Sequence, residues 1–337
     1  MNFTMSAPNE VRLELTRKCN LRCIHCFNNS SNELKNELST AEVYHIIDQL
    51  FEMRAFDIMI EGGEVFTRKD ILYILQYMSG KFKLGISTNG LLINEDLARR
   101  LSPIVDYIQI SIDGANAAVN DKIRGNGSYD MAIKAIKACV NNNIPIGMGM
   151  VLTKLNVHQI TDYIELGKSL GATACNFSRL QHTGRAKLNN TVLELSINEF
   201  IDAQRKIDEL IEKENSLVIG CNLYCYMFLL NRKRCREQNV NLINANIECV
   251  ETLTILSNGD VIPCSGLPTF IVGNVRKDSL RNIWDNSPIL NELRSIKVEG
   301  KCEFCEFVSF CRGGCRGEAF LQSGNIKAPD PLCWKDE

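Results

Sequence analysis

The chain has 337 residues and a formal net charge of -2 at pH 7, and 45% of its residues are hydrophobic. This length allows two domains, and the composition is typical of a globular protein. Acidic and basic residues are interspersed, so the sequence lacks the basic patch expected for binding to nucleic acid or to an anionic membrane surface. No apolar run is long enough to span a membrane and the N-terminus does not resemble a signal peptide, so we expect a cytoplasmic protein. In that compartment, 15 cysteines indicate metal binding rather than disulfide bonds.

Three cysteines, Cys19, Cys23 and Cys26, form a short loop directly after an apolar, strand-like run at residues 11–15. A 4Fe-4S cluster normally has four cysteine ligands, so three cysteines leave one iron open to an exogenous ligand. An open coordination position indicates catalysis, as it does at zinc sites. The alternatives are a zinc loop or a chance group of buried thiols, but zinc-binding pairs are usually two residues apart and occur as two pairs.

Strand-like and helix-like segments alternate as far as residue 180, which is typical of parallel strands joined by crossover helices. The predicted strands are residues 11–15, 56–60, 83–87, 107–112, 146–152 and 172–177. The predicted helices are residues 40–53, 69–78, 95–101, 129–141 and 157–170, with an amphipathic helix at residues 196–214. Six strands are too few for a closed eight-stranded barrel. Ligands of such sheets bind beyond the carboxyl ends of the strands, so the residues at those ends are the site candidates.

Polar side chains and glycines recur at these strand ends. Paired glycines let the backbone approach a ligand closely, and the adjacent glutamate supplies a carboxylate. The alternative is that these residues form tight turns and helix caps. The candidates are Gly62, Gly63, Glu64, Ser87, Asn89, Ser111, Asp113 and Arg124.

A second group of cysteines lies near the C-terminus. Cys249 and Cys264 flank a predicted β-hairpin, in which two apolar runs enclose the turn residues 257–260. Five more cysteines follow at restricted spacing, and seven ligands would overfill a single tetrahedral zinc site. A zinc ribbon is therefore the weaker interpretation. The five are Cys302, Cys305, Cys311, Cys315 and Cys333.

The loop from Cys19 to Cys26 resembles the signature of the radical S-adenosylmethionine (SAM) enzymes. In that family the open iron chelates the amino and carboxylate groups of SAM, and an electron from the cluster cleaves SAM to a 5'-deoxyadenosyl radical. The resemblance implies an α/β fold, a partial (β/α)6 barrel similar to a TIM barrel. The family usually has an aromatic residue at the position of His25.

The resemblance also implies which strand-end residues bind SAM. The glycine-rich motif, Gly62 to Glu64, is expected to bind the amino group, although Val65 stands where proline is common. Ser111 is expected to contact the ribose or the carboxylate, and the planar guanidinium of Arg124 can bind both carboxylate oxygens. The other expected cofactor contacts are His25, Ser87, Asn89 and Asp113. His182 and Arg185 could face SAM or the substrate, or belong to a solvated loop.

The C-terminal cysteines resemble the SPASM extension of radical SAM enzymes, which carries two auxiliary 4Fe-4S clusters. Relatives often have a cysteine where this chain has Ile243, so the fourth ligand of the first auxiliary cluster is either Cys235 or a substrate group at an open site. Cys221, Cys225 and Cys235 are also candidates for donating a hydrogen atom to a substrate radical, or they are buried small hydrophobes. The resemblance assigns Cys249, Cys264 and Cys315 to the first auxiliary cluster, and Cys302, Cys305, Cys311 and Cys333 to the second.

These features divide the chain into a radical SAM partial barrel at residues 1–217, a linker at 218–240 and a SPASM domain at 241–337. The sequence most resembles maturases of ribosomally made peptides, of the mycofactocin and pyrroloquinoline quinone type. The resemblance implies hydrogen abstraction from a peptide, followed by crosslinking, decarboxylation or epimerisation. It also implies flavodoxin or ferredoxin as electron donor. A winged-helix leader-binding domain is not expected, so a separate protein would bind the leader.

Three other functions stay open. A tetrapyrrole side-chain decarboxylase and a sulfatase-type maturase have similar cluster motifs. The sulfatase-type maturases commonly have an aspartate where this chain has Ser265, which disfavours that alternative. A non-catalytic iron-sulfur electron carrier would not need the SAM-binding residues. The sequence does not identify the substrate, the bond that changes or the oligomeric state.

Overall fold

The computed structural model describes residues 5–214, 216–222, 248–333 and 335. Within these residues, ten strands form one sheet in the order β10-β9-β8-β1-β2-β3-β4-β5-β6-β7. Strands β1 to β7 are parallel to their neighbours. The bounds are β1 Glu10–Glu14, β2 Asp57–Glu61, β3 Lys83–Thr88, β4 Tyr107–Ser111, β5 Ile146–Val151, β6 Ala174–Ser178, β7 Val218–Asn222, β8 Thr252–Ile255, β9 Asp260–Ile262 and β10 Gly273–Asn274.

The predicted fold class, a parallel partial barrel followed by a cysteine-rich region with a β-hairpin, is confirmed. The sheet nevertheless differs from the prediction in two respects. β7 lies at the start of the stretch predicted to be a linker and pairs in parallel with β6, so the barrel has a seventh strand. The hairpin strand β8 pairs in parallel with β1, so the hairpin extends the barrel sheet instead of forming a separate layer. The rest of the predicted linker lies outside the described residues.

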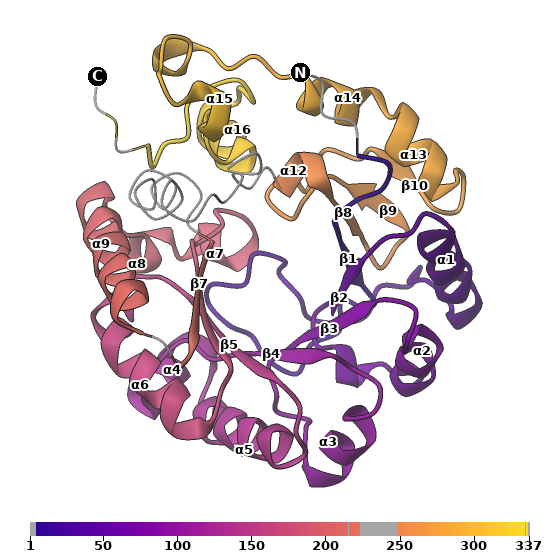
Figure 1. Ribbon diagram of the computed structural model, residues 1–337, viewed down its shortest axis with the longest axis vertical. Helices are drawn as coiled ribbons and strands as arrows, with labels where there is room; N and C mark the ends of the chain where they lie inside the picture. Colours follow the sequence, from indigo (N-terminus) through magenta and orange to yellow (C-terminus); the bar gives the residue numbers. More distant parts are fainter. Residues whose placement is uncertain (1–4, 215, 223–247, 334, 336–337) are drawn as a thin grey trace.

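Helices surround the outer face of the curved sheet, and the C-terminal helices lie opposite α3 and α5 (Figure 1). The helices around the barrel are α1 Thr40–Glu52, α2 Ile71–Met78, α3 Glu95–Leu101, α4 Ala117–Arg124, α5 Ser128–Asn141, α6 Ile160–Leu170, α7 Gly184–Leu188, α8 Asn190–Leu193 and α9 Ile197–Lys213. The C-terminal helices are α12 Glu248–Glu251, α13 Leu280–Asn286, α14 Pro288–Arg294, α15 Val308–Cys311 and α16 Arg316–Ser323. None of the described helices combines the length and the apolar character needed to cross a lipid bilayer.

Helix α1 illustrates how the sequence specifies these elements. Ser39 accepts a hydrogen bond from the backbone of Glu42, and the Glu42 carboxylate accepts one from the Ser39 backbone, so the two residues form a capping box. The apolar residues that follow at helical spacing, among them Val43, Ile47 and Leu50, are buried against the sheet. Helix α4 was not predicted, because Ile123 is its one buried apolar side chain and no apolar stripe marks it.

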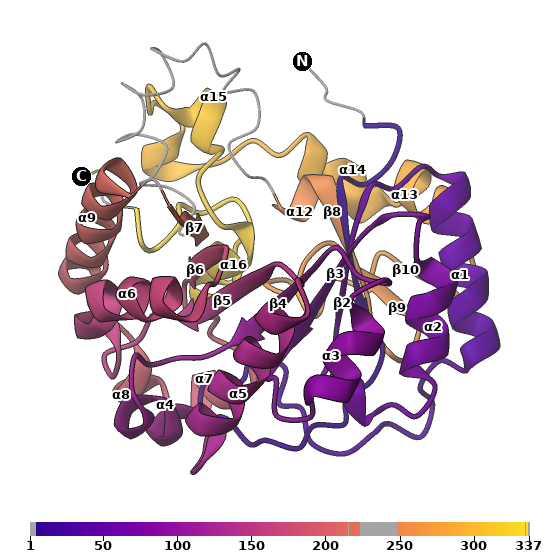
Figure 2. The ribbon, with the colours of Figure 1, turned by 60° about the horizontal axis from the view of Figure 1, so that its bottom comes forward.

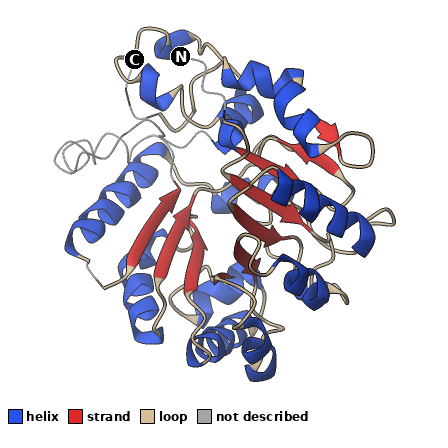
Figure 3. Cartoon of the chain, turned by 45° about the vertical axis from the view of Figure 1, so that its right-hand side comes forward, coloured by secondary structure: helices blue, strands red, loops and turns tan. Residues whose placement is uncertain are grey.

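The two faces of the sheet have different chemistry. Val11 and Leu13 of β1 are fully buried and belong to the main core between the sheet and the helices. Their alternate neighbours Glu10 and Arg12 line a cavity inside the barrel. Because successive side chains of a strand point to opposite faces, this alternation makes the outside of the barrel apolar and its interior polar. Figures 2 and 3 show the strands curving around that interior.

Candidate functional site

The loop that carries Cys19, Cys23 and Cys26 follows the carboxyl end of β1. Burial raises the pKa of Cys23 to about 11, and the nearby thiols of Cys19 and Cys26 add to this increase. The three thiols are therefore close enough to interact. No three described His, Cys, Asp or Glu side chains are arranged to hold a single metal ion. In a 4Fe-4S cluster each thiolate binds a different iron, so three neighbouring thiols on one loop fit such a cluster. The positive charge of bound iron would favour their thiolate forms.

Residues 183–185, at the start of α7, hold this loop in place. Arg185 donates hydrogen bonds from Nε to the carbonyl of Cys23 at 2.8 Å and from its backbone N–H to the carbonyl of Cys26 at 2.9 Å. The hydroxyl of Thr183 donates to the carbonyl of Phe27 at 3.0 Å. Gly184 lies so close to the loop backbone that a side chain there would collide with it. Arg185 therefore helps to fix the cluster loop, and its role toward SAM or substrate stays a prediction.

Asp113 is the centre of a buried charge cluster just after β4. Its Oδ2 lies 2.9 Å from Nε2 of His25 and 2.6 Å from Nε of Arg124, and its Oδ1 accepts a hydrogen bond from the backbone of Val151 at 2.8 Å. Burial disfavours the charged form of Asp113, but Arg124 and His25 outweigh it and lower the pKa to about 2. The side chain of Asp113 has no exposed surface. Asp113 therefore orients His25 and Arg124, and the expectation that it contacts SAM directly is revised.

The glycines of the expected SAM-binding motif pack against the cluster loop. A side-chain carbon on Gly62 would lie 2.6 Å from the carbonyl oxygen of Thr16, and one on Gly63 would collide with the carbonyl of Lys18. The backbone N–H of Gly63 donates to Thr16 at 2.7 Å. Glycine is needed at both positions because the strand end and the start of the cluster loop are in direct contact.

Glu64 is buried, and its carboxylate accepts hydrogen bonds from other residues of the chain. It is 1% exposed, and it accepts hydrogen bonds from the hydroxyl of Thr88 and the backbone of Asn89, both at 2.8 Å. Burial raises its pKa. The side chain of Asn89 in turn donates to Asn20 in the cluster loop at 2.7 Å. Glu64 and Asn89 thus join the ends of β2 and β3 to the cluster loop, whereas the sequence predicted that both contact SAM.

The interior of the barrel contains a cavity of about 480 Å³. Four of the expected cofactor contacts, His25, Ser87, Ser111 and Arg124, line it. Its volume and its mixture of polar and apolar walls are typical of small-molecule sites. Other lining residues are Glu10, Arg12, Phe27, Met59, Glu61, Tyr107, Gln109, Gly149, Val151, Asn176, Phe177, Ser178, Arg179, Gln181, Gly220 and Ser265.

The cysteines assigned to the second auxiliary cluster lie together. Burial raises the pKa of Cys302 to about 11, and the thiols of Cys333, Cys311 and Cys305 contribute to this increase. Four interacting thiols fit the complete ligand set of a 4Fe-4S cluster. The resemblance assigned these four cysteines to the second auxiliary cluster, and that assignment stays a prediction.

The cysteines assigned to the first auxiliary cluster come from three elements. Cys249 on α12 and Cys264 after β9 are buried in one small apolar cluster. Cys315 precedes α16, and the backbone of that helix packs against the loop after Cys264, where the Cα of Gly317 would lie 3.6 Å from a side-chain carbon on Gly266. Cys225 and Cys235 lie outside the described residues, as does Ile243, and only the backbone of Cys221 is described, in β7. Their predicted roles stay predictions.

Comparison with known proteins identifies the family. A family model described as the radical SAM superfamily matches residues 13–167, and one described as an iron-sulfur cluster-binding domain, SPASM, matches residues 249–306. The chain is 32% identical to the mycofactocin maturase MftC of Mycobacterium tuberculosis, across 98% of this chain and 83% of that protein. The chain belongs to the radical SAM superfamily. It is also 29% identical to the AdoMet-dependent heme synthase of Methanosarcina barkeri, across 97% of each protein.

Solved structures support the fold of this radical SAM protein. Streptococcus suis SuiB bound to S-adenosylmethionine superimposes with a TM-score of 0.82 at 19% identity, over 98% of this chain and 78% of that chain. The family matches and the MftC relative show that the chain is an enzyme with 4Fe-4S clusters and SAM as cofactors, as predicted, and they rule out a non-catalytic electron carrier.

The contacts between the barrel and the SPASM region of this radical SAM enzyme were not predicted. One set of them comes from residues 179–182, directly after β6. Arg179 forms a buried ion pair with Asp330, with Nη1 2.9 Å from Oδ2. Gln181 donates to the hydroxyl of Ser265 at 3.0 Å, and Nδ1 of His182 lies 2.6 Å from Glu318. The one sequence signal for this contact is an acidic residue, Asp330, placed between two predicted cysteine ligands.

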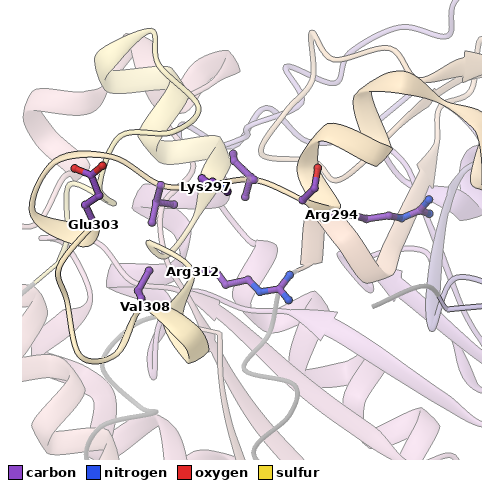
Figure 4. Close-up of a pocket in the computed structure, with 8 residues that line it drawn as sticks. Arg294, Lys297, Glu303, Val308 and Arg312 are labelled. Carbon is purple, nitrogen blue, oxygen red and sulfur yellow. The ribbon is translucent and has the colours of Figure 1, made fainter. Parts of the chain in front are cut away.

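A separate cavity of about 410 Å³ lies in the C-terminal region (Figure 4). Arg294, Lys297 and Arg312 line it together with Glu303 and Val308. It shares no lining residue with the barrel cavity. None of the SAM-binding candidates lines this second cavity, whereas four of them line the barrel cavity.

Proposed function

We propose that the protein is a radical SAM maturase that removes a hydrogen atom from a ribosomally made peptide and so starts a crosslink, a decarboxylation or an epimerisation. The observation that carries this proposal is the identity of 32% to a mycofactocin maturase over nearly the whole chain. When bound, the first cluster and SAM supply a carbon-centred radical that removes this hydrogen atom. The protein's residues bind and orient the reactants.

The lining of the barrel cavity offers groups that suit SAM and groups that suit a substrate. Arg124 faces the cavity with its charge balanced by buried Asp113, so it is held rigidly for the carboxylate of SAM. The hydroxyls of Ser87 and Ser111 lie at the ends of neighbouring strands and suit the ribose or the carboxylate. Deeper in the barrel, the side-chain amide of Asn176 donates to Gln109 at 3.2 Å, which offers neutral hydrogen-bonding groups to a peptide.

Tetrapyrrole side-chain decarboxylation is the second candidate. It is favoured by the heme synthase relative, which matches 97% of this chain over 97% of its own length. A sulfatase-type reaction has less support. Ser265 lines the cavity where those enzymes commonly have an aspartate base, and its hydroxyl accepts a hydrogen bond from Gln181.

Substrate-dependent SAM cleavage distinguishes the two candidates. The enzyme, reconstituted anaerobically and reduced with dithionite, would be incubated with SAM and either a candidate precursor peptide or an iron tetrapyrrole with propionate side chains. We expect the peptide to increase 5'-deoxyadenosine formation and to change in mass. A mass change in the tetrapyrrole alone would refute the proposal. The matched control replaces Cys19, Cys23 and Cys26 by alanine, which should abolish 5'-deoxyadenosine while auxiliary iron is retained.

We also propose the partners and the compartment. A leader-binding protein would present the peptide, and a flavodoxin or ferredoxin would supply the electron. We place the enzyme in the cytoplasm, because a reducing compartment keeps cysteine ligands available for iron. Replacing dithionite with reduced flavodoxin or ferredoxin in the same assay tests the electron donor, and no turnover with either would contradict it.

A further inference from the structure

Arg179 connects the barrel cavity to the SPASM region. It follows β6, lines the cavity and has a side chain that is 5% exposed. Its two terminal nitrogens donate to the two carboxylate oxygens of Asp330, at 2.9 and 3.3 Å, and Asp330 has no exposed side-chain surface. Two parallel hydrogen bonds fix the guanidinium in a single orientation. A positive charge is thus held rigidly between the substrate cavity and the cysteine-rich region.

Asp330 also holds the backbone of two predicted cluster ligands. Its Oδ2 accepts a hydrogen bond from the backbone N–H of Cys315 at 2.7 Å. Its carbonyl accepts one from the backbone N–H of Cys333 at 2.9 Å. Cys315 is assigned to the first auxiliary cluster and Cys333 to the second. Asp330 therefore holds a ligand of each cluster, Cys315 through its carboxylate and Cys333 through its backbone carbonyl, and Arg179 keeps the carboxylate in place.

The ion pair lies directly beside Cys315. Oδ2 of Asp330 accepts hydrogen bonds both from Nη1 of Arg179, at 2.9 Å, and from the backbone N–H of Cys315, at 2.7 Å. Charges interact strongly in such a water-poor environment. Removing either Arg179 or Asp330 would therefore change the electrostatic potential at Cys315.

We propose that Arg179, paired with Asp330, is a positioning residue that sets the reduction potential of the auxiliary cluster held by Cys315. The potential of an iron-sulfur cluster depends on nearby charge and on hydrogen bonds to its ligands. A cluster gains negative charge on reduction, so a fixed guanidinium beside a ligand stabilises the reduced form and raises the potential. The inference holds for either substrate, because it concerns the protein around the cluster and not the group that occupies the cavity.

The test measures auxiliary potentials without interference from the SAM-binding cluster. Cys19, Cys23 and Cys26 are replaced by alanine in every protein, which leaves the auxiliary clusters alone. Four variants are made in this background: Arg179→Met, Asp330→Asn, the double variant, and Arg179→Lys, which keeps the charge. Each is titrated with dithionite and followed by electron paramagnetic resonance, and iron and sulfide are counted.

We expect Arg179→Met to lower the midpoint potential of one auxiliary signal and Asp330→Asn to raise it. The double variant should fall between them, and Arg179→Lys should stay near the parent value. The matched control is Arg276→Met, which removes a partly exposed arginine that pairs with Glu42 and donates to the backbone of Asn258.

Loss of auxiliary iron in Arg179→Met together with its retention in Arg179→Lys would also support the proposal, because the charge would then be needed to hold the ligands. Full iron content with the parent potential in all four variants would overturn it. A shift no larger than that of Arg276→Met would overturn it as well.

Discussion

Replacing Asp113 by asparagine tests whether the buried charge cluster stabilises the barrel. The carboxylate has no exposed surface, and its ion pair with Nε of Arg124 has a separation of 2.6 Å. Its loss leaves the buried guanidinium without a counter-charge and weakens the contact with His25. Removing one partner of a buried ion pair typically costs about 3 to 5 kcal/mol, so we expect the free energy of unfolding to fall by about that amount.

Urea unfolding of the iron-free protein, kept anaerobic and reduced, measures this change by far-ultraviolet circular dichroism. The matched control is Asp202→Asn on α9, because Asp202 is exposed and lies 3.5 Å from exposed Arg205. We expect the control to change stability by less than about 0.5 kcal/mol. An equal decrease in the free energy of unfolding in Asp113→Asn and Asp202→Asn would refute the assigned role of Asp113. A double-mutant cycle with Arg124→Met should also show coupling, since the two residues are in contact.

The loss of stability in Asp113→Asn should depend on pH. The pKa of Asp113 is about 2 in the folded chain, below its ordinary value of about 3.9. A lowered folded pKa means that the stabilisation is complete above the unfolded value and is lost as the pH falls through the folded value. The difference in stability between wild type and Asp113→Asn should therefore be constant above about pH 5 and shrink toward about pH 2. A difference that does not shrink would contradict this account.

Three further substitutions have defined outcomes. Arg185→Ala removes a hydrogen-bond donor to the cluster loop, so iron analysis should show less iron than in wild type. An unchanged iron content would contradict the role of Arg185 in fixing that loop. Gly63→Ala places a carbon against the carbonyl of Lys18, so SAM-dependent 5'-deoxyadenosine formation should be lost in a protein that still folds. For His182, the hydrogen bond with Glu318 raises the pKa, so its stabilisation is present below about pH 6.5 and is lost as the pH rises through the folded value. Urea unfolding at pH 6 and pH 9 should show that His182→Gln differs from wild type more at pH 6.

The sequence predicted the elements whose patterns are local. Six barrel strands and the hairpin were found because apolar runs and turn residues mark them. β7 was missed because its apolar part is short and ends in Gly220, and α4 was missed because it carries no apolar stripe. The pairing of β8 with β1 joins residues more than 200 positions apart, Leu253 with Val11 for example, and no local pattern encodes such a pairing.

In the candidate site as well, local sequence patterns predicted the positions of residues, but not their contacts with residues distant in the sequence. The strand-end positions of Ser87 and Ser111 follow from the strand periodicity, and both line the cavity. Glu64 was expected to contact SAM, yet its burial and its bonds to the end of β3 depend on a neighbouring strand. Arg179 and Asp330 lie 151 residues apart, so only the folded chain reveals that they pair.

The pairing of the hairpin with β1 explains how one cavity can serve two iron-sulfur centres. The cluster loop follows the carboxyl end of β1, and the hairpin turn is fixed there because the hydroxyl of Ser257 donates to Glu14 at 2.7 Å. Since β8 runs parallel to β1, the base of the hairpin, with Cys264, lies at the amino end. His25, beside one cluster ligand, and Ser265, beside another, line the same cavity. In the proposed function, a substrate in the barrel would lie between the loop of Cys19, Cys23 and Cys26 and the predicted auxiliary ligand Cys264, and the pairing of β8 with β1 would set the separation of the two.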